Sequence, residues 1–198
     1  MGNNKSTVTG RYILLVGIGS FFLAVVFTFF SETITSRLDS ILVSTVFLII
    51  IIFINVLADL IGTAVTTASH IPFNAKSAKK IKGAPQGLRL IRNADKVANI
   101  CNDVIGDITT TVGGALGISI VIQVMQLDPQ LSQFWLNILV TAIIASVIVS
   151  GKATGKKIAL SRPDDVIFIA GRIVAYLEDI ASINPLKKGN VPKNRKGV

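Results

Sequence analysis

The stretch ILVSTVFLIIIIFINVLADLIGT, residues 41–63, decides the fold of this chain. It is apolar and uncharged over residues 41–58, and at ~1.5 Å per residue a helix over the whole stretch rises ~35 Å, enough to cross a hydrocarbon core of ~30 Å. Inside lipid every backbone N–H and C=O must be bonded within the segment, so such a stretch forms a helix. We therefore expect a membrane span that carries Asn55 and Asp59 near one end.

The composition of the whole chain is typical of a membrane protein. Of its 198 residues, 51% are hydrophobic and 16% are charged, and the mean hydropathy is +0.64. These values exclude an ordinary soluble domain. Three further stretches are long and apolar enough to span, at residues 12–30, 109–125 and 134–150. We expect an all-α, polytopic membrane protein with four transmembrane helices and two amphipathic juxtamembrane helical segments.

The distribution of basic residues predicts the orientation. Lys5 and Arg11 precede the first span, seven Lys and Arg residues lie between the second and third spans, and ten follow the fourth. The two remaining connections hold a single basic residue, Arg37. The positive-inside rule then places both termini and the long middle connection in the cytoplasm. We expect a multi-pass protein of the plasma membrane.

The net charge of +9 predicts contact with membrane lipids, through anionic headgroups at the basic segments. Nucleic acid is the weaker interpretation, because juxtamembrane segments normally carry basic residues without stacking aromatics. The sequence contains no Ser-His-acid set, no HExxH motif and no phosphate-binding loop, so we expect no enzymatic activity.

Residues 71–92 form the first juxtamembrane segment. They mix lysines with apolar residues and break at Gly83-Ala84-Pro85, a pattern typical of a helix-turn-helix at the headgroup level. The second segment, residues 163–183, carries apolar residues at helical spacing, and this face must cover the membrane, the bundle or the same helix of a second copy. We expect a single transmembrane domain over residues 1–186, followed by a basic, disordered tail over residues 187–198.

Two pairs of polar residues lie at the membrane boundaries. Asn55 and Asp59 are four residues apart at the end of the second span, and Asp103 and Asp107 are four apart just before the third. A spacing of four places each pair on one helix face, so both pairs can point at one site. Mg²⁺ prefers such hard oxygen ligands. The candidate metal ligands are Asn55, Asp59, Asp103, Asp107, Thr63 and Thr111.

Four of these residues also have a plainer interpretation. At ~27 Å along its span, Asp59 lies near the cytoplasmic boundary, where a charge costs less than at the midplane. Asp103 and Asp107 can be solvated or pair with a basic residue of the 71–92 segment. Asn55 can simply bridge two helices by hydrogen bonds.

Small residues at a spacing of four mark two helix faces. Gly113 and Gly117 form one, and Ser146 and Ser150 form the other. Such faces let helix backbones approach closely, either inside one bundle or between two copies of the chain. The many polar faces on only four spans favour a homodimer, and an additional protein partner of unknown identity stays open.

Three segments together resemble a known family. They read LADLIGTAVTTAS at residues 57–69, LRLIRNADKVANICNDVIGDITTTVGGALG at 88–117 and SGKATGKKIALSRPDDVIFIAGRIVAYLEDI at 150–180. In order and spacing they resemble the transmembrane domain of the CorB/CorC and cyclin-M (CNNM) magnesium transporters. The first is similar to its FFSASETALTSLS segment, the second to its IGN-type motif and small-residue helix, and the third to its G-E-I-x-P-K signature.

The resemblance implies a dimeric membrane domain that binds Mg²⁺ through helix oxygens and transports divalent cations, with Co²⁺ as a second ion. The chain departs from the family at Gly62 and Lys152, where the family has glutamate, and at Gly155, where it has proline. The family's CBS domains have no counterpart, so the expected form is a short one. Loss of both glutamates favours the alternative, a non-transporting membrane scaffold or regulatory partner that keeps the fold.

Overall fold

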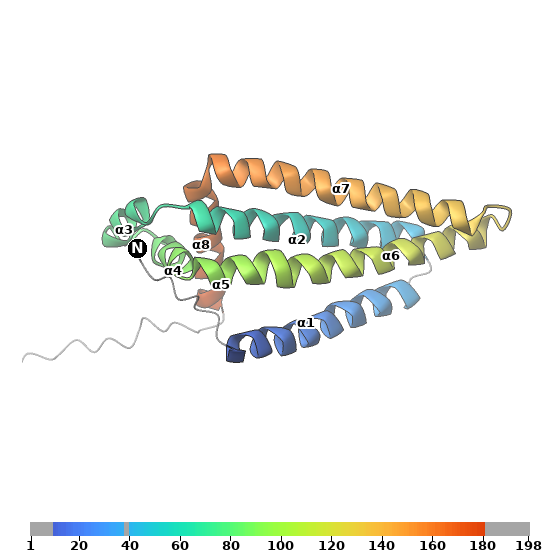
Figure 1. Ribbon diagram of the computed structural model, residues 1–198, viewed down its shortest axis with the longest axis horizontal. Helices are drawn as coiled ribbons and strands as arrows, with labels where there is room; N and C mark the ends of the chain where they lie inside the picture. The colour runs from blue at the N-terminus through green and yellow to red at the C-terminus, as the bar shows by residue number, and fades with distance from the viewer. Residues whose placement is uncertain (1–9, 38–39, 181–198) are drawn as a thin grey trace, which may run out of the picture.

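The computed structural model describes residues 10–37 and 40–180, and this part of the chain is helical and contains no β-strand (Figure 1). The all-α prediction is confirmed. The elements are α1 (Gly10–Arg37), α2 (Ile41–Thr67), α3 (His70–Ala78), α4 (Ala84–Arg92), α5 (Ala94–Asn99), the π-helix η1 (Ile100–Ile105), α6 (Gly106–Leu127), α7 (Gln133–Ser161) and α8 (Pro163–Ile180). The predicted tail, residues 187–198, and the end of the 163–183 segment lie outside the described residues.

Four helical segments are long and apolar enough to cross a membrane, as the sequence predicts. They are Ile13–Thr33, Ile41–Thr67, Ala94–Leu127 and Gln133–Ser161. The third is a continuous run of 34 residues, because α5, η1 and α6 follow one another without a break. The fourth continues eleven residues beyond its predicted end at residue 150, since lysine is a good helix former and its long stem lets the charge reach the interface.

α2 lies between α6 and α7, and the three helices share one apolar core (Figure 1). The buried members of this core are Leu48, Ile51, Ile108, Val112, Leu116, Ile144 and Ile148. A Cβ placed on Gly117 would lie 2.6 Å from Cδ1 of Ile144, and one placed on Gly113 would lie 3.7 Å from Cδ1 of Leu48. The face that carries Gly113 and Gly117 is therefore used for close packing inside the bundle.

α3, α4 and α8 gather at one end of the bundle, which we call the basic end (Figure 1). α3 and α4 form the predicted helix-turn-helix, and α8 lies crosswise at the ends of the spans, in contact with α4 and α2. A second apolar core forms here, in which Phe73 and Ile167 are 0% exposed. The amphipathic faces of α3, α4 and α8 thus cover one another in part.

A close backbone contact joins α4 to α8. Gly83, which precedes α4, has a φ of +91°, in the left-handed region that glycine favours. A Cβ placed on Gly171 would lie 2.4 Å from the carbonyl oxygen of Gly83 and 2.7 Å from the backbone nitrogen of Gly87. Only glycine at position 171 allows α8 to pass so close to this turn.

Polar side chains close the same joint. Glu178 accepts hydrogen bonds from Gln86 Nε2, at 2.9 Å, and from the Arg89 guanidinium, and Lys82 forms an ion pair of 2.7 Å with Asp179. The hydrogen bonds from Gln86 and Arg89 hold the pKa of Glu178 below its usual range, because they stabilise the carboxylate. These contacts add to the glycine contact in fixing α8 across α4.

Candidate functional site

Asn55 connects two spans, α2 and α6, inside the bundle. It is 0% exposed, and its Nδ2 lies 2.9 Å from the carbonyl oxygen of Gly106 and 2.8 Å from the hydroxyl oxygens of both Thr109 and Thr110. An amide has two N–H donors, so it serves two of these three acceptors at a time. Asn55 thereby joins α2 to the first turn of α6.

The orientation of this amide leaves its oxygen open. Thr109 donates its own proton to the carbonyl of Ile105, at 2.6 Å, and Thr110 donates to Gly106, at 2.8 Å, so both hydroxyl oxygens accept from Asn55. A flipped amide would set Oδ1 against the Gly106 carbonyl oxygen, and two acceptors would then face each other. Oδ1 instead points away, is buried and has no hydrogen-bond partner. Such an unpaired acceptor costs ~1–3 kcal/mol.

Asp59 lies one turn along α2 from Asn55, toward the basic end. Its side chain is 8% exposed, and its Oδ1 lies 3.9 Å from Lys156 Nζ, the outer limit of an ion pair. Its Oδ2 is buried and has no hydrogen-bond partner. Among the described residues, Asp59 is the one buried acid. The spacing of four keeps its carboxylate on the face of α2 that carries Asn55.

Asn102 reaches the same face of α2 from the π-helix. A Cβ placed on Gly62 would lie 2.0 Å from Asn102 Oδ1, so this amide occupies the space that a side chain at position 62 would need. Asn102 Oδ1 is buried and also lacks a hydrogen-bond partner. A residue with a side chain at position 62, including the glutamate of the resembling family, would displace Asn102.

The π-helix η1 packs against α2 just before Gly106. Its hydrogen bonds run from i to i+5, so its turn contains more residues than an α-helical turn, and such turns are frequent at functional sites. Asn102 and Gly106 face α2, whereas the carboxylates of Asp103 and Asp107 lie at exposed positions. Both pairs have a spacing of four, so the face that carries Asn102 and Gly106 is the one turned toward α2.

Lys152 approaches the same place from α7. It is half-buried, and its Nζ lies 3.7 Å from the position that a Cβ on Gly106 would take. Within the part of the chain that the structure describes, Lys152 makes no hydrogen bond or ion pair. Gly106 is therefore where α2, α6 and α7 bring polar groups together. We call this set the polar centre; its members are Asn55, Asp59, Asn102, Thr109, Thr110 and Lys152.

The structure brings together part of the predicted metal site. Asn55 and Asp59 lie inside the bundle. The other candidate ligands occupy half-buried or exposed positions: Thr63, Asp103, Asp107 and Thr111. Over residues 10–37 and 40–180, no three His, Cys, Asp or Glu side chains lie close enough together to hold a metal ion. A metal at the polar centre would therefore be bound by one carboxylate with amide and hydroxyl oxygens.

The oxygen ligands of this site suit a hard cation, but the positive charge nearby does not. Three buried oxygens lack a partner, one each from Asn55, Asp59 and Asn102, and carboxylate and amide oxygens are ligands that Mg²⁺ accepts. Two ammonium groups, those of Lys152 and Lys156, oppose a divalent ion. The polar centre thus holds open oxygens together with positive charge that the chain itself supplies.

The residues predicted from the sequence do not include four members of the polar centre: Asn102, Thr109, Thr110 and Lys152. Lys152 carried a signal, because it lies four residues after Ile148, a buried position of the fourth span, and a charge on such a face marks a functional candidate. Asn102 carried none, because residue spacing alone does not show which face of a helix turns toward its neighbour.

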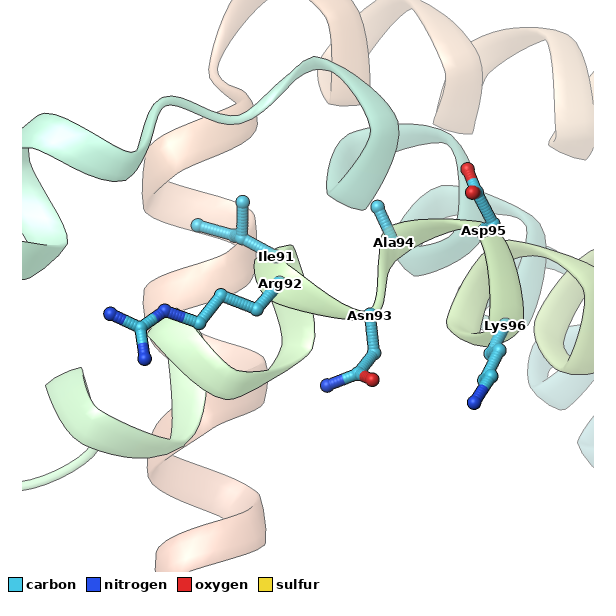
Figure 2. A pocket seen from close by; sticks show the side chains of 6 residues that line it. All are labelled: Ile91, Arg92, Asn93, Ala94, Asp95 and Lys96. Atoms are coloured by element: carbon cyan, nitrogen blue, oxygen red, sulfur yellow. The ribbon is translucent and has the colours of Figure 1, made fainter. Parts of the chain in front are cut away.

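The hollow in Figure 2 lies elsewhere, at the joint between α4 and α5. It has a volume of about 350 Å³ and is lined by Ile91, Arg92, Asn93, Ala94, Asp95 and Lys96. Asn93 and Lys96 point to one side of the joint, and Ala94 and Asp95 to the other (Figure 2). None of the predicted metal ligands lines it, so this hollow is separate from the polar centre.

Comparison with known proteins adds no further assignment. No protein-family model, no curated protein and no solved structure matches the chain. The resemblance to the CorB/CorC and cyclin-M transporters therefore stays a prediction from the three sequence segments.

Proposed function

We propose that this protein transports a divalent cation across the membrane and that the ion binds at the polar centre. Mg²⁺ is the expected ion, and Co²⁺ is the second candidate. The observation that carries the proposal is the set of buried oxygens without partners: Asn55 Oδ1, Asp59 Oδ2 and Asn102 Oδ1. The first two belong to residues one turn apart on α2, and a cation bound beside them would supply the missing interaction.

The position of these oxygens supports a transport role. Polar and ionisable residues inside spans are costly and mark ion pathways in many membrane proteins. The π-helix next to Gly106 adds support, because π-helical turns are frequent at functional sites. A bound Mg²⁺ would keep some of its waters, as it commonly does in proteins, since the centre offers one carboxylate.

Ion uptake into proteoliposomes tests this proposal. Purified wild-type chain should admit Mg²⁺, whereas Asp59→Asn should lose uptake, because the one buried carboxylate is neutralised. Asp103→Asn is the matched control; its carboxylate is exposed, so uptake should persist. Folding is checked by circular dichroism and gel filtration in detergent. Wild-type protein that is folded and reconstituted but passes neither Mg²⁺ nor Co²⁺ contradicts the proposal.

A second candidate is a non-transporting membrane scaffold or regulatory partner with the same fold. The observation that favours it is the position of Lys156, whose ammonium lies 3.9 Å from Asp59 Oδ1 and can neutralise the buried acid without a metal. This candidate predicts a folded chain without flux. It also predicts that Lys156→Gln, and not Lys157→Gln, lowers the thermal stability, since only the first removes the partner of Asp59.

The basic residues of the chain bear on its location, its orientation and its contact with lipid. We propose the plasma membrane as its location, with the basic end in the cytoplasm and in contact with anionic headgroups. Lys79 and Lys80 support this, because both are exposed at the turn after α3. We further propose a homodimer, for which the exposed small residues Ser146 and Ser150 offer a close-packing face. Light scattering in detergent, with the detergent mass subtracted, measures the copy number.

A further inference from the structure

Lys152 supplies a positive charge to the polar centre from a third helix. The face of α7 turned to the bundle carries Ile148, Gly155 and Ala159, all buried, and position 152 belongs to it by helical spacing. Lys156, one turn further, is 55% exposed along its side chain and reaches the outside. Lys152 is more enclosed, and its ammonium lies beside Gly106, the residue that Asn55 contacts.

Unpaired hydrogen-bond donors and unpaired acceptors lie near one another at the polar centre. An ammonium group has three N–H donors, and Lys152 has no partner among the described residues. Two fully buried oxygens on the facing α2, Asn55 Oδ1 and Asp59 Oδ2, have no donor. The lysine stem is flexible, so a change of rotamer can turn the ammonium toward these oxygens without moving a helix.

We propose that the Lys152 ammonium is a tethered cation that competes with a metal ion for the open oxygens of the polar centre. This inference rests on the proposed function of the polar centre in cation binding. A divalent ion must displace the ammonium before it can bind, because two positive charges at contact distance repel strongly where water is scarce. Lys152 therefore determines how much free metal the protein requires.

Metal titration of the folded protein in detergent tests the proposal. The thermal unfolding midpoint is measured against MgCl₂ concentration, and the metal retained after desalting is measured with MnCl₂ as the probe. Lys152→Met keeps an apolar stem and removes the charge, so the half-saturating metal concentration should fall by about tenfold or more relative to wild type. Lys152→Gln serves as a second neutral variant if the first does not fold.

Two controls separate charge at the polar centre from other effects. Lys152→Arg keeps the positive charge and should behave as wild type. Lys157→Met removes an exposed lysine of the same helix and should also leave the half-saturating concentration unchanged. An equal gain in Lys157→Met, or an unchanged value in folded Lys152→Met, overturns the proposal.

The outcome for the wild-type chain is separate from the outcome for the variant. Wild type that transports Mg²⁺ while Lys152→Met gains no affinity leaves the proposed function standing and overturns the role of Lys152. Wild type that binds no metal while Lys152→Met binds it supports the role of Lys152 and contradicts transport by the natural chain. If neither protein binds metal, both proposals are overturned.

Discussion

Asn102 packs against Gly62, and this contact is possible only because Gly62 has no side chain. The Asn102 amide oxygen fills the space beside Gly62, at 2.0 Å from where a Cβ would be. The same amide oxygen lacks a hydrogen-bond partner, so its place in the polar centre depends on the space that the glycine leaves.

Gly62→Ala should destabilise the protein by ~1–3 kcal/mol, because the new methyl group overpacks the contact and forces Asn102 to turn. Thermal unfolding in detergent measures the effect. Gly114→Ala is the matched control: no atom lies within 4 Å of a Cβ there, and alanine is the better helix former. The double variant Gly62→Ala with Asn102→Ala should recover most of the loss. Equal stability of Gly62→Ala and Gly114→Ala contradicts the contact.

At the level of single residues, the sequence predicted part of the polar centre. The spacing of Asn55 and Asp59 on an apolar helix was sufficient to place both on one buried face. The same spacing placed Asp103 and Asp107 on one face, but the face turned toward α2 is the neighbouring one, which carries Asn102 and Gly106. The contribution of Lys152 required the third helix, whose rotation relative to α2 is a tertiary property.

Among the elements, α8 depends on backbone contact more than on side-chain packing. A Cβ on Gly171 would meet the Gly83 oxygen at 2.4 Å and the Gly87 nitrogen at 2.7 Å, and neither of these backbone atoms can rotate away as a side chain can. Gly171→Ala should therefore cost ~3 kcal/mol or more and release α8 from α4.

Hydrogen exchange with mass spectrometry measures this release peptide by peptide. In Gly171→Ala, the amides of α4 and α8 should exchange faster, while those of α2 and α6 keep their protection, because the bundle core is independent of this contact. Gly19→Ala, on the exposed α1, has no atom within 4 Å of its Cβ and should change none of these peptides. Uniform loss of protection in Gly171→Ala would show that the two cores unfold together.

The pH dependence of the α4–α8 joint follows from Glu178. Hydrogen bonds from Gln86 and Arg89 lower its pKa, so the folded state binds this proton more weakly than the unfolded state does. The stabilisation is fully present above the ordinary glutamate pKa of ~4.3 and is lost as the pH falls through the lowered folded value. For an ion pair this accessible to water we expect ~1 kcal/mol or less.

Unfolding midpoints of wild type and Glu178→Gln, measured from pH 7 to pH 3, test this dependence. Wild type should be the more stable protein at pH 7, and the difference should shrink below about pH 4. Glu32→Gln, an exposed acid at the far end of the bundle, should show no such convergence. A constant gap between wild type and Glu178→Gln over the whole range contradicts the assignment.

For the whole molecule, the number of spans was predictable and their packing was not. A span faces lipid along its whole length, so its residues are apolar throughout. The hydropathy of the sequence is therefore sufficient to predict the four spans. The centre of the bundle does not follow: α1 is apolar like α2, yet α2 alone packs between α6 and α7. The choice comes from particular contacts such as Gly151 of α7 against Val56 of α2.

The orientation in the membrane can be tested with single cysteines. Cys101 is first replaced by alanine, and a cysteine is then placed at Asn74, on α3 at the basic end, or at Gln130, between α6 and α7. If the basic end is cytoplasmic, a membrane-impermeant maleimide should label Gln130→Cys in intact cells and Asn74→Cys only after permeabilisation. The reverse pattern contradicts the proposed orientation.

The unbroken run from Ala94 to Leu127 has a mechanical consequence. Its 34 residues form a stiff rod of about 51 Å, some 20 Å longer than the hydrocarbon core is thick. One end projects beside the hollow at the α4 joint (Figure 2), and Gly106 lies twelve residues further along. Because no loop interrupts the helix, hydrogen-bonded backbone runs without a break from the α4 joint to the polar centre.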